Sequence, residues 1–140
     1  MLSITNWKIL AVDDEPDNLS LLEDILSFFN VSITPCHSGA EALEVLKREQ
    51  FDLMLLDIQM PQLSGWDVIQ LVRQHADPAI RNMLVVAVTA LAMPKDRDRT
   101  VEAGFNGYIG KPIEVENFMR TLQEITQRES AKSKGASEQQ

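Results

Sequence analysis

The chain has 140 residues, of which 44% are hydrophobic and 24% charged; this suits one globular domain and is too short for two. Its formal net charge of −8 would repel a phosphate backbone, which argues against nucleic-acid binding. No apolar run approaches the roughly 20 residues that cross a bilayer, and the first residues lack the pattern of a secretory signal. We therefore expect a cytoplasmic protein that neither inserts into a membrane nor is secreted.

The first part of the chain alternates between strand and helix. The apolar run at 8–12 stops at three acids, and Pro16 after them suits the first turn of a helix. Leucines at helical spacing carry that helix to about Asn30. The strand at 31–36 contains Pro35, which cannot donate to a ladder, so we expect this strand at a sheet edge. A capping-box signature, Ser followed three residues later by Glu, then opens the second helix.

The most apolar stretch is the third strand, at 53–56, which stops at Asp57. An unbroken apolar run flanked by polar residues fits a strand buried on both faces of a parallel sheet. The remaining expected elements, in chain order, are a helix at 65–74 that breaks near Pro78, a strand at 83–88, a charged segment at 93–103 closed by Gly104, a strand at 106–110 and an amphipathic helix from Val115.

This order of elements predicts the fold class. Alternating strands and helices with short connections predict an α/β fold, a flavodoxin-like, doubly wound, five-stranded parallel sheet of (βα)5 type. The edge position of the proline strand favours the strand order 2-1-3-4-5, which opens a crevice between the ends of strands one and three. From about residue 128 the composition becomes polar. We therefore predict a domain at 1–127 and a disordered tail at 128–140.

Reactive side chains follow the strands at the edge where their carboxyl ends meet, namely Asp13, Asp14 and Glu15 after the first, Asp57 after the third, Thr89 after the fourth and Lys111 after the fifth. Carboxylates this close repel one another unless a cation compensates them. Mg²⁺ is the expected cation, because it takes one or two carboxylates, waters and phosphate oxygens. The set suits phosphoryl transfer, with Asp57 as the candidate nucleophile.

The same residues resemble the receiver domains of response regulators in two-component signalling. The resemblance covers about residues 7–127, and its motifs occur in the family's order and spacing. It rests on Asp13-Asp14, on Asp57 followed by Met60-Pro61 and Gly65, on Thr89-Ala90, and on Tyr108 three residues before Lys111-Pro112. Ser64 departs from the Asp or Asn of many relatives, which affects only the expectation for the local turn.

The resemblance implies a role for each residue of the site. Asp57 would accept a phosphoryl group as an aspartyl phosphate, and Lys111 and Thr89 would contact the phosphoryl oxygens. Mg²⁺ would be ligated by Asp14, Asp57 and the main-chain carbonyl of Gln59, with Asp13 acting mostly through metal-bound water. Thr89 and Tyr108 would form the conformational switch, the tyrosine moving from exposed to buried. The Lys111–Pro112 peptide bond is usually cis in this family.

The resemblance also implies partners. The phosphoryl donor would be a sensor histidine kinase or a histidine phosphotransfer protein, and the signal would pass by contact to a downstream protein target. The protein could also form a homodimer. Because nothing globular can be built from the tail, we expect a stand-alone receiver. It would be a signalling switch rather than an enzyme, catalysing only its own phosphorylation and dephosphorylation.

Two other classes of protein share parts of this pattern. A metal-dependent phosphotransferase or phosphatase would also use an aspartyl phosphate, but it usually carries a second acid where this chain has Gln59. A flavodoxin-like nucleotide or flavin binder should show a Gly- or Ser/Thr-rich loop after the first strand, where this chain is acidic. Taken singly, the site residues also have plainer interpretations, as helix caps for Asp13 and Thr89, a solvated lysine for Lys111 and ordinary packing for Tyr108.

One further pattern lies on the first helix. Leu21, Ile25 and Phe28 form a second apolar stripe beside the core stripe. It is either part of a wide buried face or, in our hypothesis, a docking site for a helical partner. The second interpretation predicts that Ile25→Glu slows phosphotransfer from the cognate donor.

Overall fold

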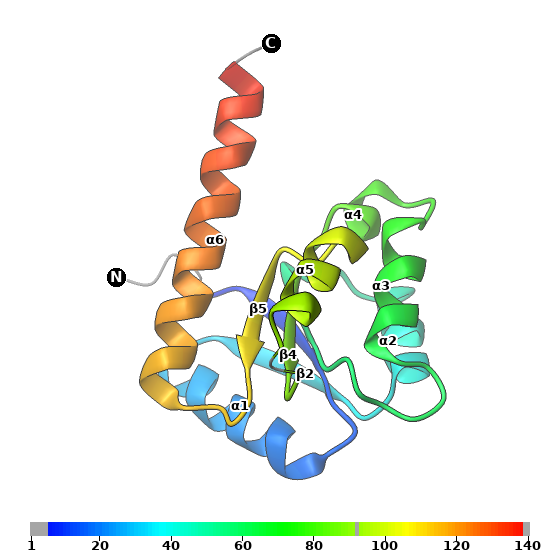
Figure 1. Ribbon diagram of the computed structural model, residues 1–140, viewed down its shortest axis with the longest axis vertical. Coiled ribbons are helices and arrows are strands. Elements are labelled where there is room, and N and C mark those ends of the chain that lie inside the picture. The colour runs from blue at the N-terminus through cyan, green and yellow to red at the C-terminus, as the bar shows by residue number, and fades with distance from the viewer. Residues whose placement is uncertain (1–5, 92, 139–140) are drawn as a thin grey trace.

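The computed structural model describes residues 6–91 and 93–138 and contains one five-stranded parallel sheet (Figure 1). Its strands are β1 (Lys8–Val12), β2 (Ser32–Cys36), β3 (Leu53–Leu56), β4 (Leu84–Thr89) and β5 (Gly107–Gly110). They lie in the order β2-β1-β3-β4-β5, and every neighbouring pair is parallel. The predicted fold class and strand order are confirmed.

Six helices connect or follow the strands among the described residues. They are α1 (Pro16–Phe28), α2 (Gly39–Leu46), α3 (Gly65–Arg73), α4 (Pro78–Arg81), α5 (Pro94–Ala103) and α6 (Val115–Glu138). The side chains of α1 and α6 pack on one face of the sheet and those of α2, α3 and α4 on the other. Figure 1 shows α6 extending past the body of the domain.

Alternation along the strands builds a core on each face. In β1, Leu10 and Val12 face the α2–α3 side, whereas Ile9 and Ala11 face the α1–α6 side. All four residues of β3 are at most 1% exposed, which confirms the expectation of a strand buried on both faces. In contrast, β2 pairs only with β1 and most of its residues are partly or fully exposed, so the strand that carries Pro35 is the predicted edge strand.

Helix ends follow the expected capping chemistry, with one departure. Ser38 caps α2 by accepting a hydrogen bond from the N–H of Glu41 at 3.1 Å, but the Glu41 carboxylate accepts from His37 instead of closing the box. The complete capping box is formed at α3, where Ser64 and Asp67 bond each other's backbone N–H. Ser64 is thus a good cap for the turn where the family pattern has Asp or Asn.

The structure contains a helix that the sequence did not indicate. The third helix ends near Arg73 as predicted, but the segment after the break forms the single turn α4. Asp77 caps it by accepting from the N–H of Ala79 at 3.0 Å, and Pro78 occupies its first turn. Four residues are too few to display a hydrophobic period, so periodicity could not reveal this element.

The last helix is longer than expected. The tail predicted to be disordered from residue 128 continues α6 as helix to Glu138. The tail mixes good helix formers (Lys, Glu, Ala and Arg) with Ser and Gly, and the Arg128 side chain donates to the main-chain carbonyl of Asn106 at 2.6 Å. The domain boundary at residue 127 stays a prediction.

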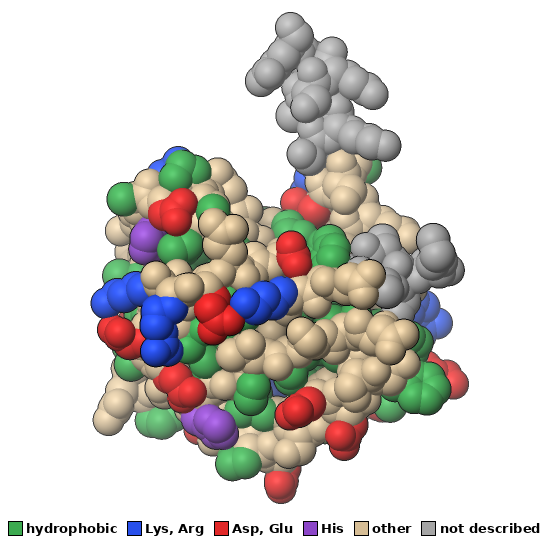
Figure 2. Space-filling view, turned by 180° about the vertical axis from the view of Figure 1, so that it is seen from behind, with side chains coloured by type: hydrophobic (Ala, Val, Ile, Leu, Met, Phe, Trp, Pro, Cys, Tyr) green, Lys and Arg blue, Asp and Glu red, His purple; other side chains and the backbone are tan. Residues whose placement is uncertain are grey.

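Seen from the opposite side, acidic and basic side chains are interspersed on the surface and the apolar ones lie in separate groups (Figure 2). Among the described residues, no helix is both long enough and apolar enough to cross a membrane.

Candidate functional site

Strand β3 delivers Asp57 to the carboxyl edge of the sheet. Its N–H donates to the carbonyl of Val12 at 3.0 Å, which fixes the end of β3 against β1. The residue is 4% exposed, and its Oδ1 accepts a hydrogen bond from the N–H of Gln59 at 3.3 Å. The following loop folds back so closely that a Cβ on Gly65 would lie 2.5 Å from the Asp57 carbonyl oxygen. Glycine is therefore required where α3 begins.

Two more carboxylates lie beside Asp57. The N–H of Asp13 donates to the carbonyl of Cys36 at 3.0 Å, and its Oδ1 accepts from the N–H of Glu15 at 2.9 Å. Asp13 is buried, and Asp14 is the more exposed of this pair. Ligand oxygens of Asp13, Asp14 and Asp57 all lie within 4.8 Å of one another, so the cluster could hold a metal ion.

Lys111 compensates two of these negative charges. Its Nζ lies 2.9 Å from Asp13 Oδ2 and 3.2 Å from Asp57 Oδ2. The main-chain N–H of Lys111 donates to the Thr89 carbonyl at 2.9 Å. The Lys111–Pro112 peptide bond is cis, as the family resemblance implied. The ends of β1, β3, β4 and β5 are thus brought together through one lysine.

Burial sets the protonation behaviour of this cluster. Loss of solvent raises the pKa of the Asp57 carboxyl; the positive charge of Lys111 opposes that rise and the negative charge of Asp13 adds to it, so that the pKa ends above its ordinary value. Burial lowers the pKa of Lys111, but its hydrogen bond to Asp13 and the two carboxylate charges outweigh burial and leave it raised. A protonated lysine beside a desolvated carboxylate is suited to receive further negative charge.

The two predicted switch residues occupy different environments. Thr89 is fully buried, and its Oγ1 accepts a hydrogen bond from the N–H of Leu91 at 3.4 Å. Tyr108 is half-buried on β5, and its hydroxyl oxygen is buried without a hydrogen-bond partner among the described residues. The guanidinium carbon of Arg97 lies 5.4 Å from the centre of the Tyr108 ring. Sequence reasoning missed this arginine, because nothing local shows that α5 and β5 meet there.

The stripe on α1 divides in a way the sequence did not show. Ile25 is 4% exposed and belongs to the core, whereas Leu21 is 37% and Phe28 82% exposed. These two residues line an apolar hollow of about 280 Å³ together with Asp24, Ile25, Phe29 and Val115. Ile25→Glu would therefore disrupt the core and is the wrong variant for a docking test.

The fold and the site define a class of protein: a doubly wound α/β domain with a carboxylate–lysine cluster at the carboxyl edge of its sheet. The family model of the response regulator receiver domain matches residues 9–123. The chain belongs to this family.

Two relatives differ in how much of their length this chain covers. The histidine-protein kinase BarA of Shigella flexneri is 40% identical over 114 residues, which cover 81% of this chain and 12% of BarA. The polar-differentiation response regulator DivK of Brucella ovis is 35% identical over 114 residues, covering 81% of this chain and 91% of DivK. The chain thus spans a small part of the kinase and nearly all of the regulator.

A solved structure adds a third comparison. The receiver domain of the sensor histidine kinase PA1611 from Pseudomonas aeruginosa, solved with a magnesium ion in its active-site cleft, is 30% identical. It superimposes with a TM-score of 0.75 over 86% of this chain and 97% of that one. Receiver domains act as signalling switches in two-component systems.

Proposed function

We propose that the protein accepts a phosphoryl group on Asp57 from the phosphohistidine of a sensor histidine kinase or a histidine phosphotransfer protein. The observation that carries the proposal is the contact of Lys111 Nζ with both Asp57 and Asp13, beside a third carboxylate. A carboxylate with a fixed cation beside it, at the edge where parallel sheets bind their ligands, suits acyl-phosphate formation. Membership of the receiver family supports the same chemistry.

The transfer step follows from these contacts. An oxygen of Asp57 attacks the phosphorus; the new P–O bond forms as the P–N bond breaks, and the bonding pair leaves with the imidazole. The raised pKa of Lys111 keeps it protonated, so its ammonium group stabilises charge on the phosphoryl oxygens. The Thr89 hydroxyl, which accepts from Leu91, retains a proton to donate to one of them.

The acidic cluster fits Mg²⁺, which prefers oxygen ligands and keeps several waters. We propose that Asp14, Asp57 and the Gln59 carbonyl bind it directly, with Asp13 holding a metal-bound water. The ion would neutralise charge on the carboxylates and the phosphoryl oxygens. The magnesium-bound receiver of PA1611 supports this assignment.

Intact mass after incubation with Mg²⁺ and a small acyl phosphate tests the acceptor. One phosphoryl adduct is expected on the natural chain and none on Asp57→Asn. Thr89→Ala and Lys111→Met are expected to slow the adduct's formation, since each removes a group that stabilises the phosphoryl oxygens. No adduct on the natural chain, or one that survives Asp57→Asn, would rule the proposal out.

We also propose that the donor docks on the exposed part of the α1 stripe. Leu21 and Phe28 are open to solvent beside an apolar hollow, and exposed apolar patches of this kind mark protein contacts. Phe28→Glu should slow phosphotransfer from the cognate donor about tenfold, the order expected for one central aromatic contact. Labelling by a small acyl phosphate should not change.

The control for docking is Leu71→Glu, a similar change at a half-exposed leucine on the opposite layer of helices. Two outcomes would count against α1 as the docking surface. One is that both variants slow phosphotransfer from the donor equally. The other is that Phe28→Glu slows this phosphotransfer and the labelling by acyl phosphate to the same extent. In line with DivK, which this chain matches along most of its length, we propose a response regulator that acts in the cytoplasm, signals by contact with a downstream protein and can form a homodimer.

A further inference from the structure

Helix α5 is attached to the domain by few apolar side chains. Of its ten residues only Thr100 is buried, and the Thr100 hydroxyl donates within the helix to the carbonyl of Arg97. Val101 is 73% exposed. Helices on globular domains are normally held by an apolar stripe that faces the core. Other contacts must therefore fix the position of α5.

Two arginines of α5 make such contacts on two neighbouring elements. The Arg99 guanidinium lies 4.0 Å from the ring centre of Trp66 on α3, and the Arg97 guanidinium lies 5.4 Å from that of Tyr108 on β5. Cations over aromatic rings at these distances are attracted by the negative face of the ring. Because the arginines are two residues apart, they leave the helix in different directions and hold it on two sides.

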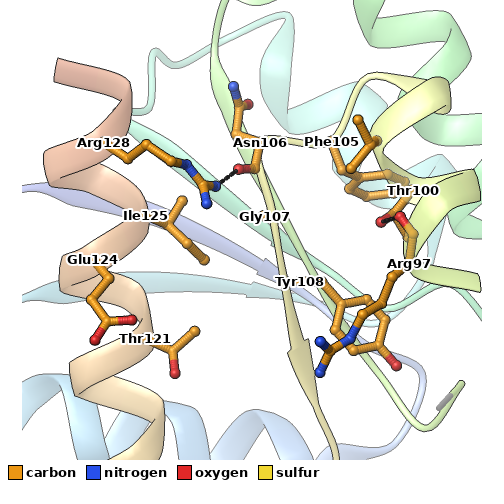
Figure 3. A pocket seen from close by; sticks show the side chains of 11 residues that line it. Arg97, Thr100, Phe105, Asn106, Gly107, Tyr108, Thr121, Glu124, Ile125 and Arg128 are labelled. Atoms are coloured by element: carbon orange, nitrogen blue, oxygen red, sulfur yellow. Dashed lines mark hydrogen bonds between the residues drawn. The ribbon is translucent and has the colours of Figure 1, made fainter. Parts of the chain in front are cut away.

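The Tyr108 ring depends on this contact more than on its hydroxyl. The hydroxyl oxygen is buried without a partner among the described residues, so no hydrogen bond there fixes the ring. Tyr108 also lines two hollows, of about 340 and 260 Å³, that offer space for another position. Figure 3 shows the Arg97 side chain lying along the tyrosine ring between α5 and β5.

We propose that Arg97 and Arg99 form an arginine latch, a pair of positioning residues that fix α5. Before phosphorylation they hold the Tyr108 ring in its half-buried position with the hydroxyl oxygen enclosed, here called the buried ring. The latch itself concerns the unphosphorylated chain. Its effect on signalling rests on the proposed function, in which a phosphoryl group on Asp57 favours the buried ring. By linkage, a contact that stabilises the buried ring then also raises the affinity of the site for a phosphoryl group.

A fluorine label tests the latch directly. The chain has one tyrosine, so 3-fluorotyrosine gives a single ¹⁹F resonance from Tyr108. Arg97→Ala is expected to move this resonance towards its position in the unfolded chain, and Arg97→Lys to move it less. Lys95→Ala, which removes an equal charge from an exposed position on α5, should leave it unchanged. Identical resonances for the natural chain, Arg97→Ala and Lys95→Ala would overturn the latch.

Titration with beryllofluoride and Mg²⁺ tests the coupling to the site. The beryllofluoride concentration at half-saturation should rise about two- to fivefold in Arg97→Ala, because one exposed cation–π contact contributes a factor of this size. It should rise in the same direction in Arg99→Ala and stay unchanged in Lys95→Ala. An unchanged midpoint in both arginine variants would overturn the coupling. A natural chain that binds no beryllofluoride would instead contradict the proposed function, while the resonance comparison would still decide the latch.

Discussion

At the scale of the residue, the site shows how burial prepares a carboxylate for chemistry. Asp57 is almost fully buried, and its pKa is raised because loss of solvent outweighs the attraction of Lys111. Its ionised form is therefore less favourable in the folded chain than in the unfolded one. The free energy stored in this way becomes available when a metal ion or a phosphoryl group enters the cluster. Binding of a metal ion or a phosphoryl group thus offsets the unfavourable burial of the ionised Asp57 carboxylate.

We therefore predict that Asp57→Asn stabilises the metal-free protein by about 1 kcal/mol at neutral pH, or about 3 °C in Tm. A carboxyl with a raised folded-state pKa contributes stability at low pH that is lost as pH rises through that pKa. The ordinary pKa of an aspartate carboxyl is 3.8. The gain from Asp57→Asn should therefore be absent at or below that pH and develop as the pH rises.

Thermal unfolding of both proteins across this pH range, with and without Mg²⁺, is the measurement. Mg²⁺ should reduce the difference in Tm between the two proteins. It binds the natural carboxylate more tightly than the amide and so stabilises the folded natural chain by mass action. A variant less stable than the natural chain at every pH would show that the Lys111 contact outweighs burial.

At the scale of the element, one arginine joins the ends of several segments. Arg73, at the end of α3, donates to the carbonyls of Arg81, Met83 and Gly104 and to the side chain of Asn106, at distances from 2.6 to 2.9 Å. Asn106 Oδ1 also accepts from the N–H of Val85, the second residue of β4. The guanidinium therefore ties α3, α4, α5 and the starts of β4 and β5 at the edge opposite to the site.

Arg73→Met is expected to destabilise the domain by about 3 kcal/mol, since it removes four hydrogen bonds, three of them part-buried. The control is Arg81→Met, an exposed arginine whose guanidinium donates to the nearby carbonyls of His75 and Ala76; it should cost below about 1 kcal/mol. Urea unfolding of the two variants measures the difference, and equal costs would mean that the Arg73 network carries no special stability.

At the scale of the whole molecule, the contribution of α6 to the core declines along the helix. Among its residues up to Lys132, the last buried ones are Ile125 and Thr126, whereas Lys132 is exposed. Helical structure continues to Glu138. The stretch from 127 to 132 therefore adds little to the apolar core.

Truncation tests this boundary and the predicted domain of 1–127. A chain that ends after Glu129 keeps Ile125 and Arg128, so its Tm should stay within about 2 °C of the full chain. A chain that ends after Gln123 loses the Ile125 side chain, which packs against Gly107, and should lose about 3 kcal/mol or more. A large loss of Tm in the chain that ends after Glu129 would place the domain boundary later in the sequence.

Local patterns along the chain determined the strands, all helices but α4, the order of these elements and the chemistry of the strand ends. Buried runs such as 53–56, the proline in β2 and the acids, threonine and lysine at four strand ends are local signals, and parallel sheets bring such ends to one edge. The tertiary structure alone decided which side chains from distant segments meet. In the folded chain Ile25 is buried, and four hydrogen-bond acceptors surround the Arg73 guanidinium. The guanidinium of Arg97 contacts the Tyr108 ring, and that of Arg99 contacts the Trp66 ring. These contacts depend on how helices sit against the sheet, which no local period or propensity encodes.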